Sequence, residues 1–283
     1  MYIDNQVEHL SHPVRVHESG VADAGSGLRW YARSVGRGLL SMGEFSRQDP
    51  PDVVHVHTSH RYSFYRAAFY VLYARHVWHR PVVLHVHGSS FHDFVADAPR
   101  GLAALQRRIF DASDRIVVLS EYWRSVVSER ADPDRIHVVP NAVDPSTFET
   151  GPVSADPHLV MVSNLIERKG VREFVSAVDS LRERLDRPFQ VSIAGSGPLA
   201  PLAESLADRH ECVTYHGYVS EADKRSLLAS GSIFVLPTHA EGLPIAMLEG
   251  MAAGNAIVST TVGAIPEVID EDRGTLVAPG DET

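Results

Sequence analysis

Two residue types with reactive side chains are almost missing from this chain of 283 residues. Only two of its 26 basic residues are lysine, Lys169 and Lys224, and all the others are arginine. The single cysteine, Cys212, excludes an internal disulfide and is consistent with a reducing compartment. Neither lysine has the sequence surroundings of a Schiff-base lysine, which argues against an enzyme that depends on pyridoxal phosphate.

Long apolar runs and an excess of basic charge are also missing. No stretch of about 18 apolar residues is present to span a bilayer, and the first residues, MYIDNQVEHL, lack the basic and apolar regions of a signal peptide. The net charge of -10 argues against a nucleic-acid partner, because phosphate contacts need a basic surface. We therefore expect a soluble cytoplasmic protein. Its 44% of hydrophobic residues is normal for a globular chain and excludes general disorder.

Short apolar runs alternate with helical patterns through most of the chain. The expected strands are rich in valine or isoleucine, and they cover Val53–His57, Val82–Val86, Ile116–Leu119, Ile136–Val139, Leu159–Val162, Val191–Ala194, Val213–Tyr215, Ile233–Leu236, Ala256–Ser259 and Leu276–Ala278. The expected helices cover Ser63–Trp78, Gly101–Ala112, Val171–Arg184, Leu199–Arg209, Glu221–Ala229 and Ile245–Ala253. This alternation predicts an α/β fold whose doubly wound parallel sheets are covered on both faces.

A turn-rich segment divides the pattern into two halves. Asp144–Pro157 contains three prolines and several turn formers, and it predicts two domains, at residues 1–150 and 151–283. Ligands of such sheets bind beyond the carboxyl ends of the strands, so the two domains should face each other across a cleft. Before Val53 only Val14–Val16 has a strand pattern, and no closing helix follows Leu276–Ala278. We therefore expect a chain that is clipped at both ends, with an incomplete N-terminal domain.

The strongest chemical signal follows the strand at Ile233–Leu236. Glu241 precedes a predicted helix, Gly242 and Leu243 offer backbone amides to a phosphate or a sugar hydroxyl, and Pro244 is expected as the first helical residue. Glu249 follows eight residues after Glu241, which predicts two carboxylates along a similar helical face. A carboxylate accepts two hydroxyl bonds at once and suits the diol of a ribose. Taken alone, the pair is explained better as a capping glutamate followed by an exposed helix glutamate.

The surrounding segments add specificity to this pair. Glu-Gly-Leu-Pro at 241–244, Ala-Gly-Asn-Ala-Ile-Val-Ser-Thr at 253–260 and Gly-Ala-Ile-Pro-Glu at 263–267 resemble the donor-domain signature of family 4 retaining glycosyltransferases. Gly-Ser-Gly-Pro at 195–198, His-Gly-Tyr-Val at 216–219 and Pro-Asn-Ala-Val-Asp at 140–144 resemble further loops of that family. The resemblance implies the GT-B architecture of two facing Rossmann-like domains. It also implies hexosyl transfer from a UDP- or GDP-sugar without a metal or other cofactor.

The resemblance assigns roles to the donor side of the cleft. Lys169, with Arg168 as a candidate substitute for the family arginine that is absent at Asn164, would hold the donor diphosphate. Two cations at a helix N-terminus make sense only with an anion between them. Glu249 would bind the ribose, and Glu241 would hold hydroxyls of the donor sugar. The resemblance further assigns donor contacts to Gly195, Gly197, Tyr218, Val219, Gly242, Leu243 and Pro244.

The N-terminal half supplies the candidates for the acceptor side. His87-Gly88 resembles the family's histidine loop, which makes His87 a sugar-orienting or charge-stabilising group. Ser120 resembles the family's serine loop and is equally explained as a helix cap, while Asn141 belongs to the PNAVD turn. The acceptor implied is a glycan, a lipid-linked hydroxyl or a small molecule. The aromatic stretch RYSFYRAAFYVLYARHVW is expected to form a core helix, with peripheral contact to the inner face of a membrane as a further hypothesis.

Other classes of protein remain open at this point. The pairs His55/His57 and His85/His87 each place two imidazoles on one face of a strand, which is typical of an H-x-H metal hydrolase. A sugar-nucleotide epimerase or a phosphorylase-like enzyme shares the two-domain shape. A clipped relative that binds sugar nucleotide without turnover is the non-catalytic alternative. Oligomeric state, donor base and acceptor do not follow from the sequence.

Overall fold

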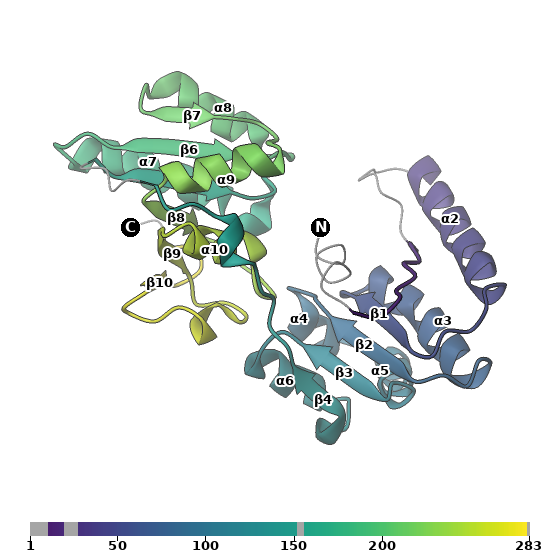
Figure 1. The fold of residues 1–283 in the computed structure, drawn as a ribbon. Coiled ribbons are helices and arrows are strands. Elements are labelled where there is room, and N and C mark those ends of the chain that lie inside the picture. The colour runs from purple at the N-terminus through teal and green to yellow at the C-terminus, as the bar shows by residue number, and fades with distance from the viewer. Residues whose placement is uncertain (1–10, 20–27, 152–155, 282–283) are drawn as a thin grey trace.

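The protein forms two parallel sheets that are joined by the segment between β4 and β5 (Figure 1). The computed structural model describes residues 11–19, 28–151 and 156–281. The N-terminal sheet has four strands in the order β1-β2-β3-β4, and the C-terminal sheet has six in the order β10-β9-β8-β5-β6-β7. Every strand pair is parallel, as the strand–helix alternation predicted.

The N-terminal sheet alternates with helices along the chain. Its elements are α2 (Leu28–Ser46), β1 (Val54–Thr58), α3 (Tyr62–His76), β2 (Val82–Val86), α4 (Phe91–Ala96), α5 (Arg100–Asp111), β3 (Arg115–Val118), α6 (Glu121–Ser128) and β4 (Ile136–Val138). In β1 the side chains of Val54, Val56 and Thr58 are buried, and the alternate residues His55 and His57 occupy the opposite face. This alternation places His55 and His57 on one face of β1, which is an edge strand of the sheet.

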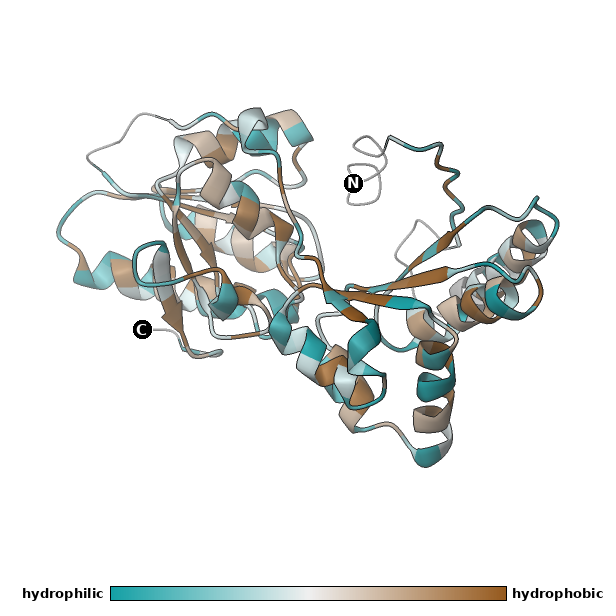
Figure 2. Ribbon diagram, turned by 60° about the horizontal axis from the view of Figure 1, so that its bottom comes forward, coloured by the Kyte–Doolittle hydropathy of each residue, from teal (hydrophilic) through white to brown (hydrophobic). Residues whose placement is uncertain are grey.

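The C-terminal sheet follows the same plan with more strands. Its elements are β5 (His158–Val162), α7 (Val171–Arg184), β6 (Gln190–Ala194), α8 (Ala200–Arg209), β7 (Val213–Tyr215), α9 (Glu221–Ser230), β8 (Ile233–Leu236), α10 (Ile245–Ala252), β9 (Ala256–Thr260) and β10 (Gly274–Val277). A separate apolar cluster, which includes Phe174, Ile193 and Leu206, packs α7 and α8 against the sheet. Figure 2 shows that the strands of both sheets are mainly hydrophobic, whereas the helices also carry hydrophilic residues.

The predicted strands are confirmed to within one or two residues, and the predicted helices agree equally well. One expectation was wrong, because Val14–Val16 forms no strand. Helix α2 was not predicted, although it contacts α3 at the outer side of the N-terminal sheet (Figure 1). Within the described part of the chain, no helix is both long enough and apolar enough to cross a bilayer.

Candidate active site

The loop between β8 and α10 contains the first of the two glutamates. Helix α10 begins at Ile245, and Pro244 is its N-cap residue with an extended backbone (ψ 119°). Pro244 therefore lies one residue earlier than predicted. Glu241 lies outside the helix, so the expectation that Glu241 and Glu249 share a helical face was wrong. The loop, rather than helical periodicity, determines where the Glu241 carboxylate points.

The Glu241 carboxylate is buried and paired with two cations. Glu241 is 6% exposed. The Lys169 ammonium donates a hydrogen bond to Oε1 of Glu241, and Nη1 of Arg168 lies 3.8 Å from Oε2. The same Arg168 nitrogen donates to the carbonyl oxygen of Ala240. A buried carboxylate needs such partners, since an unpaired charge away from water is strongly unfavourable. Arg168 and Lys169 thus converge on the residue that the sequence singled out.

Close packing of two loops creates this convergence. Gly170 adopts a left-handed conformation (φ 72°), and a Cβ added there would lie 1.8 Å from the carbonyl oxygen of Pro237. Only glycine permits this approach. The carbonyl oxygen of Arg168 then accepts hydrogen bonds from the His239 amide at 2.8 Å and from the Thr238 hydroxyl at 2.9 Å. The 3-10 helix Glu167–Lys169 is thereby fixed against the β8–α10 loop.

Glu249 lies inside α10 and has a different lysine as its partner. The Lys224 ammonium, from α9, donates to Oε1 of Glu249 at 2.7 Å and lies 2.9 Å from Oε2 of Glu221. Burial disfavours the charge on Lys224, but the hydrogen bonds to Glu249 and Glu221 outweigh it and raise the pKa of Lys224 above its usual value. Each of the chain's two lysines therefore pairs with one of the two glutamates.

The glycine loop after β6 keeps the backbone close to the strand ends. Gly195 and Gly197 have φ values of 139° and 154°, and a Cβ at Gly195 would lie 1.8 Å from the carbonyl oxygen of Ser163. The Gly195 amide donates to the carbonyl oxygen of Gly217 at 2.7 Å, which joins this loop to the one after β7. Tyr218, next in that loop, is 83% exposed, whereas Val219 packs against the core.

Strand β1 and the end of β2 place four imidazoles side by side. His57 Nδ1 and His87 Nε2 share a hydrogen bond of 2.8 Å, and the rings of His85 and His87 stack with centroids 4.0 Å apart. Burial and the neighbouring imidazoles lower the pKa of His57 to about 3, of His85 to about 2 and of His87 to about 4. All three rings are therefore neutral at neutral pH, so His87 offers hydrogen bonds rather than a positive charge.

Three contacts join the domains beside this loop. The Asn141 amide donates to the carbonyl oxygen of Leu243 at 2.7 Å, and the Trp123 indole donates to that of Gly242 at 3.2 Å. The Glu267 carboxylate accepts from the backbone amides of residues 121 and 122, at 2.9 and 2.7 Å. A carboxylate at a helix N-terminus is favourable for the helix dipole. Both glycine and leucine of the EGLP segment are thus fixed against the N-terminal domain through their backbone.

The histidine loop and the EGLP segment are in direct contact. A Cβ added to Gly242 would lie 3.1 Å from the backbone oxygen of His87. Gly88 is buried, and a Cβ there would meet the His60 amide at 3.2 Å. Ser120 is the N-cap residue of α6 and its hydroxyl accepts from the Trp123 amide at 3.3 Å. The capping interpretation of Ser120 is confirmed, and its place on the acceptor side stays a prediction.

A cleft of about 440 Å³ opens between the two domains at this junction. Its walls come from the segment around the start of α4, the start of α6, the β8–α10 loop and the segment after β9. Glu241 lines it from the C-terminal domain, and Ser89, Ser90 and Asp93 line it from the N-terminal domain. The cleft lies beyond the carboxyl ends of strands in both sheets, as the topology predicts for a ligand site.

The structure brings Arg168, Lys169 and Glu241 together and places His87 next to Gly242. No role was predicted from the sequence for Lys224, Trp123 or Glu267. These residues contact the site from other elements. The scarcity of lysine was the one signal that pointed to Lys224. Glu267 belongs to the quoted GAIPE segment, but nothing in its sequence indicates which helix it caps.

Two family models match consecutive parts of the chain. The model described as Glycosyltransferase Family 4 matches residues 8–147, and the one described as Glycosyl transferases group 1 matches residues 156–283. The chain is 31% identical over 160 residues to one of the subunits of human phosphatidylinositol N-acetylglucosaminyltransferase, covering 55% of this chain and 33% of that protein. It is 30% identical over 198 residues to a GDP-mannose-dependent phosphatidylinositol monomannoside mannosyltransferase of Mycobacterium tuberculosis, with 62% and 51% covered. The chain thus spans about a third to a half of the length of these curated relatives.

Solved structures with the same architecture confirm the fold class. Sucrose-phosphate synthase from Thermosynechococcus elongatus matches with a TM-score of 0.71 at 16% identity, over 88% of this chain and 66% of that one. Anabaena HepE, solved with UDP and glucose, matches with a TM-score of 0.67 at 15% identity, over 86% and 69%. The two parallel sheets therefore correspond to the two Rossmann-like domains of the GT-B architecture.

Proposed function

Because the chain belongs to the family 4, or group 1, glycosyltransferases, we propose that it transfers a hexosyl group from a nucleoside-diphosphate sugar to a hydroxyl acceptor with retained anomeric configuration. Two relatives support this by name, since one belongs to an N-acetylglucosaminyltransferase and the other depends on GDP-mannose. A similar solved structure contains UDP and glucose. The proposed donor is accordingly a UDP- or GDP-sugar.

The observation that supports this function best is the buried Glu241 carboxylate with its two cations at the mouth of α10. Arg168 and Lys169 offer positive charge to a donor diphosphate, and the first amides of α10 have no carbonyl partner within the helix. The carboxylate belongs to a residue that lines the cleft, and it pairs with both cations. A diphosphate and a sugar ring that enter together would therefore meet cations and a carboxylate in adjacent positions.

The proposed mechanism uses the two cations and the carboxylate at different parts of the donor. The bond between the anomeric carbon and the diphosphate oxygen breaks, the acceptor oxygen bonds to the same face of that carbon, and the acceptor proton passes to the departing diphosphate. Lys169 and Arg168 stabilise the negative charge that develops on the diphosphate. Glu241 holds sugar hydroxyls and favours the positive charge that develops on the ring. Preorganised groups of this kind contribute about 3 kcal/mol or more each to lowering the barrier.

The remaining residues position the two substrates. Glu249 is proposed to bind the ribose hydroxyls, with its Oε1 held by Lys224. His87 is neutral at neutral pH, so it is proposed to orient the transferred sugar by a hydrogen bond. The residues of the cleft wall from the N-terminal domain, among them Ser89, Ser90 and Asp93, would contact the acceptor. The acceptor class is a glycan, a lipid-linked hydroxyl or a small molecule, and no metal takes part in the proposed transfer.

The test is a transfer assay with UDP- and GDP-hexoses against phosphatidylinositol vesicles and a panel of oligosaccharides, after treatment with a chelator. We expect release of nucleoside diphosphate that requires an acceptor, and a glycosidic product with the donor's anomeric configuration by NMR. An inverted product contradicts retention. Tight binding of a sugar nucleotide without turnover across the whole panel contradicts transfer and leaves a binding protein.

A further inference from the structure

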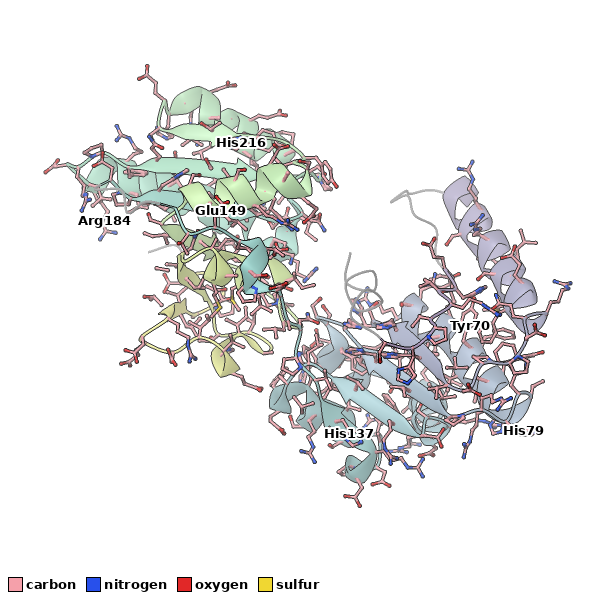
Figure 3. All side chains as sticks on the ribbon, viewed as in Figure 1. Tyr70, His79, His137, Glu149, Arg184 and His216 are labelled. Carbon is pink, nitrogen blue, oxygen red and sulfur yellow. The ribbon has the colours of Figure 1, made fainter. Side chains whose placement is uncertain are left out.

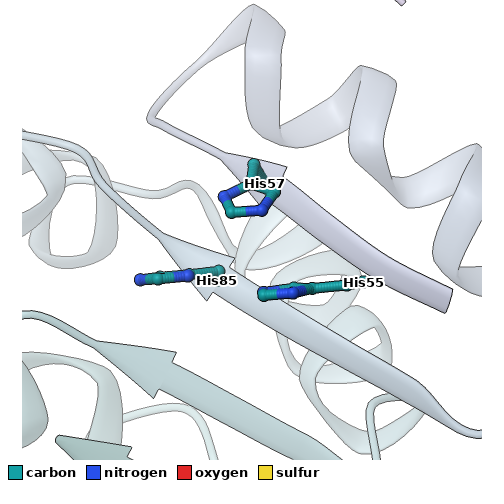
Figure 4. Close-up of side chains that lie close together, drawn as sticks. All are labelled: His55, His57 and His85. Atoms are coloured by element: carbon teal, nitrogen blue, oxygen red, sulfur yellow. The ribbon is translucent and has the colours of Figure 1, made fainter. Parts of the chain in front are cut away.

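A cluster of three histidines, His55, His57 and His85, lies outside the proposed donor site. His57 and His85 are register partners in the parallel pair β1–β2, and His55 lies two residues before His57 on the same face of β1. Figure 4 shows the rings of His57 and His85 near the carboxyl ends of β1 and β2, with the ring of His55 beside them on the same face. Regular strand geometry therefore fixes the relative positions of their Cβ atoms.

The nitrogen atoms of this cluster are close enough to share one ion. One ring nitrogen from each residue lies within 4.8 Å of the other two. A tetrahedral zinc ion, with Zn–N bonds of about 2.0–2.1 Å, holds its nitrogens about 3.4 Å apart. His55 is exposed, so its side chain can rotate and bring its ring nitrogen closer to the other two. Within the described ranges, no other group of three histidine, cysteine, aspartate or glutamate side chains has this spacing.

The chemistry of the cluster selects one class of ion. Three imidazoles without a carboxylate suit zinc and its neighbours cobalt and nickel, whereas magnesium and calcium prefer oxygen ligands. His85 is only 1% exposed and so is held rigidly by its surroundings. The hydrogen bond between His57 Nδ1 and His87 Nε2 supplies an outer partner of the kind that orients metal-binding histidines. With its proton on His57 Nδ1, this bond makes Nε2 of His57 the nitrogen with the lone pair.

We propose that His55, His57 and His85 bind one divalent transition-metal ion, of which zinc is the expected species, with water as the fourth ligand. Three protein ligands and one water are the usual composition of an open zinc site. The proposal does not depend on the glycosyltransferase activity. It adds a metal site beside His87, in the N-terminal domain, to a transfer reaction that is proposed to need no metal.

The experiment titrates the whole chain, stripped with a chelator, with Zn²⁺ by calorimetry and with Co²⁺ by visible absorption. We expect one ion per chain and the intense visible bands of tetrahedral cobalt, and no binding of Mg²⁺. His55→Asn should weaken zinc binding by at least about tenfold, because loss of an outer partner alone typically costs about 10- to 100-fold. Since His55 is exposed, this variant is expected to fold, and its circular dichroism verifies that.

A matched control comes from the far edge of the same sheet. His137 lies on β4, at the opposite edge from β1, and is exposed (Figure 3). His137→Asn should bind zinc as the wild type does. His85→Asn provides the second ligand variant, and it should abolish the cobalt bands. Zinc binding with unchanged stoichiometry and affinity in both His55→Asn and His85→Asn would overturn the proposal, because the other histidines would then account for it.

Discussion

Replacing Glu241 with glutamine is expected to lower the rate of sugar transfer by about 100- to 1,000-fold, equivalent to about 2.7–4 kcal/mol of barrier. Glutamine keeps the size of the side chain and an oxygen that accepts the Lys169 hydrogen bond. It removes the negative charge that the mechanism places near the ring as positive charge develops there. The measurement is kcat for transfer, together with the affinity for free UDP or GDP, which should stay within about twofold of the wild type.

The control for this variant is a carboxylate on the segment that carries Lys169. Glu167 is exposed and bonded to Arg172 at 2.9 Å, so Glu167→Gln makes the same chemical change outside the proposed machinery. We expect it to transfer at the wild-type rate. A Glu241→Gln enzyme that is as fast as Glu167→Gln would remove Glu241 from the mechanism, even if the donor still binds.

Replacing Lys224 with methionine is expected to lower the free energy of unfolding by about 3–5 kcal/mol. The side chains of Lys224 and Glu249 are 9% and 8% exposed, so the variant leaves a buried carboxylate without its cation. The double variant Lys224→Met, Glu249→Leu removes both charges and should recover a large part of the loss. Urea unfolding of the two variants and the wild type measures these differences. Arg107→Met, an exposed charge on α5, is the control and should change stability by less than about 0.5 kcal/mol.

The pH dependence of the Lys224→Met variant provides a second readout. Burial raises the pKa of Glu249, and Lys224 opposes that shift in the wild type. Without Lys224 the folded-state pKa of Glu249 rises further above its unfolded value. Stability from such a group is present below the unfolded pKa and is lost as pH rises through the folded pKa. The loss in free energy of unfolding that Lys224→Met causes should therefore be larger at about pH 8 than at about pH 4.5. If this loss in free energy of unfolding is the same at both pH values, the result contradicts a buried ion pair between Lys224 and Glu249.

The sequence predicted the fold well because the strands of a doubly wound sheet are short, apolar and separated by helices of ordinary length. The expected strand at Val82–Val86 and the expected helix at Val171–Arg184 match the structure residue for residue. Helix α2 was not predicted, although its apolar residues recur with helical periodicity. Glycine and arginine interrupt that pattern, and several of the apolar residues, such as Leu39 and Leu40, are exposed.

The geometry of the candidate site was less accessible to sequence reasoning. Spacing suggested that Glu241 and Glu249 share a helical face, but the N-cap at Pro244 leaves Glu241 in a loop. The partner of Glu249 is 25 residues away, and its approach depends on how α9 packs against α10. The number of residues between two side chains does not predict whether packing of their helices brings them into contact. The presence of just two lysines became informative only with the structure, in which Lys169 pairs with Glu241 and Lys224 with Glu249.

The central claim is that Glu241 and Glu249 hold different parts of one sugar nucleotide. The direct measurement is calorimetric titration of UDP, GDP and their hexose conjugates into the wild type, Glu249→Gln and Glu241→Gln. We predict that Glu249→Gln weakens free nucleoside diphosphate and sugar nucleotide alike, by about tenfold. Glu241→Gln should weaken only the affinity gained from the sugar. A wild-type chain that binds none of these ligands, or two variants that both bind them as the wild type does, would contradict the account.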